Sequence, residues 1–233
     1  MSSASGSGVF LVQSRIAARS AKDTVLTPEI FRKWYEDVHI PDVLATPNIE
    51  AAFRYQITTS PEKASHPYLA IYPLDDLSWV QDKEDAFFKI PLHSDVLPNE
   101  SRFIFDVADF DMRFYETVVS TAPGAGLKGP AKNVVLVPID ESAFNAATTV
   151  EDREKLLGGS VSGDSDAVRS TLFRLLFVPT EVTSDGKEKA PNSVAKYLAL
   201  HEFDKVPVAG TVGEAGRSFS LLRAFGDVNK TWP

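Results

Sequence analysis

The sequence contains no cysteine and only two methionines. A chain without thiols cannot form disulfides, bind a metal through thiolate or use a cysteine nucleophile. It also lacks any run of about 18 consecutive apolar residues, the length that a membrane-spanning helix needs. The first residues, MSSASGSG, are small and lack the apolar core of a signal peptide. These absences predict a cytoplasmic protein that does not associate with membranes.

Positive charge is scarce, since 24 lysines and arginines face 32 aspartates and glutamates, for a net charge of −8. No basic cluster is available for nucleic-acid phosphates. The four histidines lack the spacing of metal ligands, such as two at positions i and i+4. Residues 124–129 match the pattern GxGxxG, but Pro130 and a β-branched segment follow where a dinucleotide site needs a helix. We therefore expect no nucleic-acid partner, no metal and no cofactor.

The composition is that of an ordinary globular protein, 43% hydrophobic and 24% charged. The 233 residues suffice for one large or two small domains. Residues 1–8 are expected to be a flexible tail, and residues 121–131 form a linker rich in glycine, proline and alanine. This linker divides the chain into a first unit, residues 9–120, and a second unit, residues 132–233.

The first unit alternates between strand and helix patterns. An amphipathic pattern predicts a helix between the first two strands, and a second helix is expected from Asp76 to about Ile90. The order strand, helix, strand, strand, helix, strand is that of an α+β ferredoxin-like unit, an antiparallel sheet with both helices on one face. The four strands are expected at Val9–Ile16, Ala52–Ile57, Tyr68–Leu74 and Arg102–Val119.

The first helix has clear end signals. Thr27 is a suitable N-cap, Pro28 is tolerated in the first turn, and apolar residues then recur at helical spacing. His39 lies in the last turn, and Pro41 predicts that the helix ends beside it. In the strands that follow, side chains should alternate between two faces. We expect Phe53, Tyr55 and Ile57 to share one side of the second strand. In the third strand, we expect Tyr68, Ala70 and Tyr72 to face one way and Leu69 and Ile71 the other.

The second unit repeats parts of the first in the same order. Residues 134–137, VVLV, resemble residues 9–12, VFLV, and residues 197–204 resemble residues 68–75. Residues 172–174 resemble residues 52–54, which places Arg174 at the position of Arg54. We interpret the second unit as an eroded copy of the first, and the whole chain as a degenerate tandem repeat.

Further elements of the second unit fit this interpretation. Thr149–Leu157 predicts a shortened first helix, and Ser218–Phe225 predicts the closing strand. A ferredoxin-like sheet covers one face with helices and leaves the other in need of a partner. Two units in one chain could therefore close an α/β barrel internally. We expect a monomer with an internal pseudo-dimer, with a homo-oligomer as the alternative.

The segment around the first helix resembles the helix signature of EthD-like proteins, in the dimeric α/β-barrel superfamily. The resemblance is closest over roughly residues 9–116. It implies that His39 projects into a cavity between helix and sheet. It does not imply one reaction, because members include cofactor-free oxygenases, isomerases, cyclases, decarboxylases and proteins without known activity. The matching residues are Trp34, Glu36, His39, Pro41, Asp42, Arg54 and Tyr55.

Three residues are candidate catalytic groups: His39, Tyr72 and Arg54. A histidine in a cavity can move protons near neutral pH. A tyrosine hydroxyl or a strand arginine could hydrogen-bond and polarise a substrate oxygen. The candidate substrate-binding residues are Tyr35, Trp34, Tyr55, Arg113 and His201.

Each candidate also has a purely structural interpretation. His39 could stabilise the end of its own helix, and Tyr72 and His201 could be ordinary strand residues. Arg54 and Arg113 could form surface salt bridges, and the aromatic residues could simply be core. The two remaining histidines, His66 and His93, flank turns beside prolines and are expected to be solvated.

These residues lead to a hypothesis about function. The protein is expected to be a cofactor-free enzyme that uses acid/base chemistry on a small aromatic or polyketide-like molecule, for cyclisation, isomerisation, decarboxylation or dehydration. A cofactor-independent oxidoreductase or monooxygenase would use the same kind of pocket and is one alternative. A non-catalytic ligand-binding barrel is the other.

Overall fold

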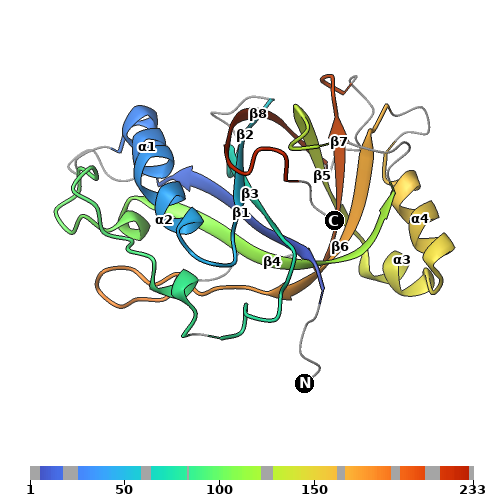
Figure 1. The fold of residues 1–233 in the computed structure, drawn as a ribbon, viewed down its shortest axis with the longest axis horizontal. Helices are drawn as coiled ribbons and strands as arrows, with labels where there is room; N and C mark the ends of the chain where they lie inside the picture. Colours follow the sequence, from blue (N-terminus) through green and yellow to red (C-terminus); the bar gives the residue numbers. More distant parts are fainter. Residues whose placement is uncertain are drawn as a thin grey trace.

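A computed structural model of the 233-residue protein describes residues 6–17, 26–58, 64–82, 84–121, 128–161, 166–189, 195–207 and 216–230. The strands in these residues form one closed antiparallel barrel, in the order β1-β3-β2-β8-β5-β7-β6-β4 (Figure 1). A barrel closed within one chain, as the sequence predicted, is therefore confirmed. The strands are β1 Gly8–Ile16, β2 Ala51–Ile57, β3 Tyr68–Leu74, β4 Ala108–Thr121, β5 Asn133–Ile139, β6 Arg169–Phe177, β7 Tyr197–Phe203 and β8 Arg217–Gly226.

The two halves of the chain share one strand order. The first half runs β4-β1-β3-β2, the second runs β8-β5-β7-β6, and antiparallel pairs β2–β8 and β4–β6 join them. The register corrects one sequence match. Arg54 of β2 lies opposite Ala70 of β3. Ala199 of β7 matches Ala70 in the sequence comparison, and the residue opposite Ala199 is Leu172, not Arg174. Arg174 is instead an exposed residue paired with Glu116.

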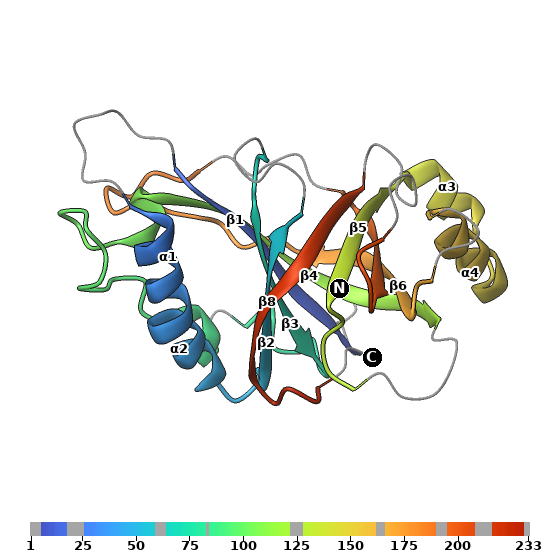
Figure 2. The ribbon, with the colours of Figure 1, turned by 90° about the horizontal axis from the view of Figure 1, so that it is seen from above.

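Helices lie on two sides of the barrel. α1 (Pro28–Trp34) and α2 (Ile40–Leu44) lie on one side, and α3 (Glu141–Ala146) and α4 (Val150–Gly159) lie on the opposite side (Figures 1 and 2). The predicted cap of α4 is confirmed, because Thr149 forms a capping box with Asp152. In the residues that the structure describes, no helix is long and apolar enough to cross a membrane.

The prediction of a second helix between β3 and β4 is wrong. The segment contains turns and two short 3₁₀ helices, η2 (Ala86–Lys89) and η3 (Ile104–Asp106), and β4 starts only at Ala108. The cause is local, since three aspartates each accept a hydrogen bond from the backbone N–H two residues further on, which competes with helix formation. They are Asp76, Asp82 and Asp85.

The first helix does not end at His39, as Pro41 had suggested. A π-helical turn, η1 (Tyr35–His39), connects α1 to α2, and the helical path continues to Leu44. The Ile40 N–H bonds to the Tyr35 carbonyl, five residues back. Pro41 then falls in the first turn of α2, where its missing N–H costs little.

Alternation along the strands divides the core into two layers. Phe53, Tyr55 and Ile57 of β2 share one face, and so do Leu69 and Ile71 of β3, which confirms the predicted alternation, and both sets pack inside the barrel. Ala70 and Tyr72 face outward and pack with Phe31 and Trp34 of α1. Both faces of the β1-β3-β2 sheet are therefore buried, one by the barrel interior and one by the helix.

Candidate functional site

His39 lines a cavity between the helical segment and the outer face of the barrel. The cavity has a volume of about 170 Å³. Strands β1 and β4 form its floor, the helix forms one wall, and residues from two connections complete it. Its lining is almost entirely apolar: Phe10, Val12, Trp34, Tyr35, His39, Phe87, Phe88, Ile90, Leu92, Phe105, Phe110, Met112, Pro179 and Thr180. We call this the His39 pocket.

The π-helical turn positions the His39 ring. The ring stacks on Trp34 at 4.8 Å with an interplanar angle of 13°, and meets the edge of Tyr35 at 5.4 Å. In a regular α-helix, residues five apart would point about 140° away from each other. The wider turn at Tyr35–His39 brings Trp34 and His39 to the same side. The histidine is thereby directed toward the aromatic cavity.

No protein group bonds the imidazole within the described part of the chain. Nδ1 of His39 is buried and has no hydrogen-bond partner. The ring as a whole is partly exposed, so Nε2 is the nitrogen that a ligand can reach. Neither a tyrosine nor an arginine of a facing strand therefore bonds His39 among the described residues. Tyr72 and Arg54 lie on the far side of Tyr35 and do not line the pocket.

Tyr72 and Arg54 also have buried polar atoms without hydrogen-bond partners among the described residues, namely the Tyr72 hydroxyl and Nε of Arg54. Tyr35 lies near enough to raise the pKa of Tyr72, yet its hydroxyl does not meet the geometry of a hydrogen bond. The Arg54 guanidinium carbon lies 4.4 Å from the centroid of the Tyr35 ring. His39, the Tyr72 hydroxyl and the Arg54 guanidinium thus all lie around the Tyr35 ring, which separates them.

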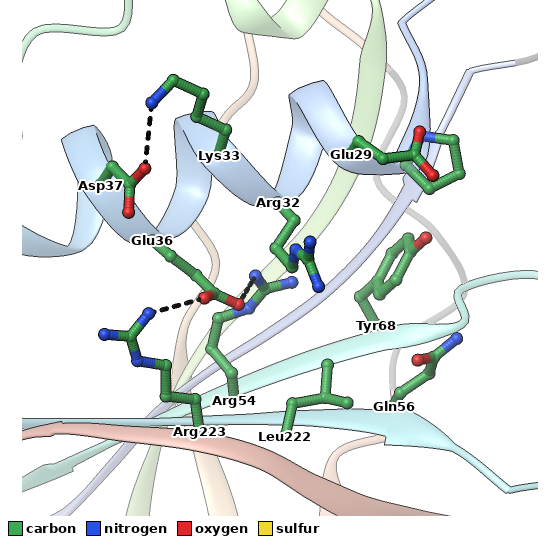
Figure 3. Close-up of a pocket in the computed structure, with 11 residues that line it drawn as sticks. Glu29, Arg32, Lys33, Glu36, Asp37, Arg54, Gln56, Tyr68, Leu222 and Arg223 are labelled. Atoms are coloured by element: carbon green, nitrogen blue, oxygen red, sulfur yellow. Dashed lines mark hydrogen bonds and ion pairs between the residues drawn. The ribbon is translucent and has the colours of Figure 1, made fainter.

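Arg54 also faces a charged groove on the other side of α1. Its Nη1 donates to Glu36 at 3.0 Å, and Glu36 accepts a second bond, at 3.2 Å, from Arg223 of β8 (Figure 3). The groove has a volume of about 800 Å³. Arg54 is only 1% exposed, so the surface salt bridge that was one interpretation of the sequence is wrong. The arginine forms a buried ion pair beneath the groove.

Burial favours the neutral forms of His39, Tyr35 and Tyr72. It lowers the pKa of His39 to about 4, and the positive charge of Arg54 lowers that pKa further. Burial also raises the pKa of Tyr35, and raises that of Tyr72 well above its usual value. At neutral pH the uncharged His39 imidazole therefore lies beside the uncharged Tyr35 phenol.

The structure brings together some of the predicted site residues and separates others. Trp34 and Tyr35 line the His39 pocket. Tyr55 lies inside the barrel, where its hydroxyl donates to the Ala131 carbonyl at 3.1 Å. Arg113 also points inward, and its guanidinium forms two hydrogen bonds with Asp111, at 2.6 and 2.5 Å. It is 6% exposed, so its expected surface salt bridge is wrong as well.

His201 lies in the second half, far from His39 in the sequence and bonded at both ring nitrogens. Ser160 is 2.7 Å from Nε2, and Ser170 is 2.8 Å from Nδ1. The Ser160 hydroxyl donates to the Leu157 carbonyl, so it accepts from Nε2, and Nδ1 accepts from Ser170. This histidine has no capacity left for a substrate, which agrees with its structural interpretation.

The sequence did not reveal the residues that close the His39 pocket. Pro179 and Thr180 come from the connection between β6 and β7, in the second half of the chain. This connection is held against β4, where the Phe110 N–H donates to Glu181 at 2.8 Å and Lys189 donates to Asp109 at 2.9 Å. The alternation in β4 could have identified Phe110 and Met112, but nothing local marks Pro179 or Thr180.

Comparisons with known proteins add little beyond the fold. No protein-family model matches the chain, and no curated protein matches it. Two solved structures resemble it across most of their length. One is an anthrone oxidase-like protein, with 9% identity, a TM-score of 0.49 and coverage of 97% of this chain and 95% of that one. The other, from Fusobacterium nucleatum, is provisionally named a monooxygenase, with 6% identity, a TM-score of 0.48 and coverage of 97% and 96%.

Among the described residues, no group of three or more histidine, aspartate or glutamate side chains is placed to hold a metal ion. His66 is 8% exposed, so the prediction that it is solvated is wrong, whereas His93 is exposed as predicted.

Proposed function

We propose that the protein is a cofactor-free enzyme that performs acid/base chemistry on a small aromatic molecule bound beside His39. The observation that carries the proposal is an imidazole that lines an aromatic cavity and has no hydrogen-bond partner among the described residues. Buried polar atoms are nearly always bonded, so an unpaired histidine costs stability. A ligand that supplies the missing partner explains why such a histidine is there.

The size of the pocket limits the substrate. An apolar cavity of about 150 Å³ holds one benzene molecule. At about 170 Å³, the His39 pocket fits one aromatic ring with one or two small substituents. A polyketide with several fused rings would need the η2 segment or residues 179–180 to move. We therefore favour a single-ring phenol or cyclic enol.

The chemistry follows from the state of the imidazole. Neutral His39 can take a proton at Nε2 from an acidic O–H or C–H of the substrate. The substrate anion formed beside it then raises the histidine pKa from its low starting value, because opposite charges stabilise each other in an apolar site. Arg54, behind the Tyr35 ring, adds positive charge that favours the anion. Return of the proton to another atom would complete an isomerisation or a cyclisation.

We also infer that the chain is a tandem repeat of two ferredoxin-like units, the first of them EthD-like. Register supports the repeat. Tyr72 lies opposite Phe10, and His201 lies opposite Val135, at matching positions of VFLV and VVLV. The second helix of each unit would then be lost, replaced in the first unit by turns and η2.

Proton transfer can be tested before the natural reaction is known. We would incubate the protein in D₂O with resorcinol and with small cyclic 1,3-diketones, and follow deuterium exchange at carbon by NMR. The expected result is exchange faster than in buffer. His39→Gln should slow that exchange by about 100-fold, the usual contribution of a general base. His93→Gln, at an exposed histidine outside the pocket, should change nothing.

The same experiment separates the alternatives. Ligands that bind without exchange, and are displaced equally from His39→Gln, would indicate a non-catalytic binding protein. Oxygen consumption that accompanies ligand loss would indicate a cofactor-free oxidoreductase or monooxygenase. Full exchange activity in a folded His39→Gln protein would contradict the role given to His39.

A further inference from the structure

A second cavity lies at one end of the barrel interior, on the opposite face of the sheet from the His39 pocket. In β4, Phe110 and Met112 face the His39 pocket, whereas Asp111 and Arg113 line the second cavity. Its volume is about 220 Å³. The function proposed for His39 does not involve this cavity.

The charges in the cavity do not cancel. Asp111 is fully engaged by Arg113 in a buried two-bond ion pair. Arg217 of β8 also lines the cavity, and its Nη1 donates to the Gln13 carbonyl oxygen at 2.8 Å. In the described residues it has no carboxylate partner. One positive charge therefore remains at the cavity in a protein of net charge −8.

Hydrogen-bonding capacity is also left over. His66 is 8% exposed, lines the cavity, and its Nε2 has no hydrogen-bond partner in the described part of the chain. Gln13 uses its carbonyl oxygen for Arg217, which leaves its amide N–H groups as donors. Ser65 adds a hydroxyl at the rim. Unused donors and one positive charge are the features of an anion site.

The opposite wall is apolar, formed by Leu136, Pro138 and Leu198. We propose that this cavity binds a small monocarboxylate, with the carboxylate against Arg217, Gln13 and His66 and the apolar body against that wall. A guanidinium matches the two oxygens of a carboxylate. The volume fits a molecule of about seven to nine non-hydrogen atoms, judged from the space that benzene occupies.

The test uses sodium pentanoate as the probe and the full-length protein at low salt. Calorimetry should show saturable binding with a dissociation constant of about 1 mM or below. 1-Pentanol, which has the same chain without the charge, should bind at least tenfold more weakly. Arg217→Gln should weaken pentanoate binding by about tenfold or more, because it removes the uncompensated charge. Arg217 is exposed, so this variant is expected to fold.

Arg174→Gln is the matched control, since it makes the same charge change at an exposed arginine of another strand, and it should bind pentanoate normally. NMR amide shifts should cluster around Gln13 and Asp111 and spare the Trp34 indole of the His39 pocket. The proposal is overturned by any of three results. The first is pentanoate binding that does not saturate by about 20 mM, which corresponds to negligible affinity. The second is equal binding of pentanoate to the Arg217→Gln variant, and the third is a set of NMR shifts centred on Trp34.

Discussion

The buried hydroxyl of Tyr72 leads to a prediction that runs against the usual effect of a core mutation. Most substitutions in a core destabilise, by about 1 kcal/mol on average. Tyr72 is fully buried, and its hydroxyl has no hydrogen-bond partner in the part of the chain that the structure describes. An unpaired buried hydroxyl costs about 1–3 kcal/mol. Tyr72→Phe removes that cost and keeps the ring contact with Phe10, at 5.5 Å between centroids. We expect the free energy of unfolding to rise by about 1 kcal/mol.

Tyr55 provides a matched control on the neighbouring strand. It is also fully buried, but its hydroxyl donates to the Ala131 carbonyl. Tyr55→Phe removes the donor and leaves that carbonyl without it, so the free energy of unfolding should fall by about 1–2 kcal/mol. The same chemical change at two buried tyrosines is thus expected to have opposite signs.

Urea unfolding of the two variants and the parent measures this difference. The slope with denaturant should be unchanged, because the surface exposed on unfolding is the same. In a protein of this size, 1 kcal/mol shifts the melting temperature by about 2–4 °C. If Tyr72→Phe destabilises as much as Tyr55→Phe, then the Tyr72 hydroxyl has a partner, such as an ordered water or Tyr35. In that event, the cluster of unpaired groups around Tyr35 would lose one member.

Two further predictions concern pH and assembly. Burial lowers the pKa of both His39 and His201 to about 4, so between pH 6.5 and 4 the unfolded chain binds more protons than the folded one. The free energy of unfolding should therefore fall as the pH drops through this window. His201→Gln should reduce the slope by up to about 1.4 kcal/mol per pH unit; an unchanged slope would mean that His201 titrates normally when folded. Glu181 has the opposite effect on the pH dependence. Burial raises its pKa to about 7, so its contribution to the free energy of unfolding is lost as the pH rises from about 4.5 to 7. Because the described strands close on one another, light scattering at micromolar concentration should give the monomer mass of 25.5 kDa; a stable dimer would show that another surface drives assembly.

The strands could be predicted closely from the sequence because their signal is local. β3 was predicted with the bounds that the structure shows, and the alternation of Leu69 and Ile71 against Ala70 and Tyr72 was correct. In β2, Phe53 and Tyr55 share one face, as predicted. Each of these predictions requires only a two-residue period and apolar side chains.

The errors have long-range or side-chain causes. The π-helical turn depends on a shifted backbone hydrogen bond that no residue pattern announces, and it carries the helix past Pro41. His66 follows a polar turn, but the barrel end encloses it. Thr180 reaches the His39 pocket from the second half of the chain. Such contacts depend on the closure of the whole barrel, which local periodicity cannot encode.

The two halves of the barrel differ most at the positions where they should match. In the proposed repeat, Tyr72 of β3 corresponds to His201 of β7, and both face outward beneath a helical layer. His201 is bonded at both nitrogens by Ser160 and Ser170, whereas the Tyr72 hydroxyl has no hydrogen-bond partner among the described residues. A fully satisfied polar group stabilises its surroundings, and an unsatisfied one costs stability unless a ligand uses it. The second half therefore has the features of a scaffold that closes the barrel and covers the pocket, and the first half has those of the working site.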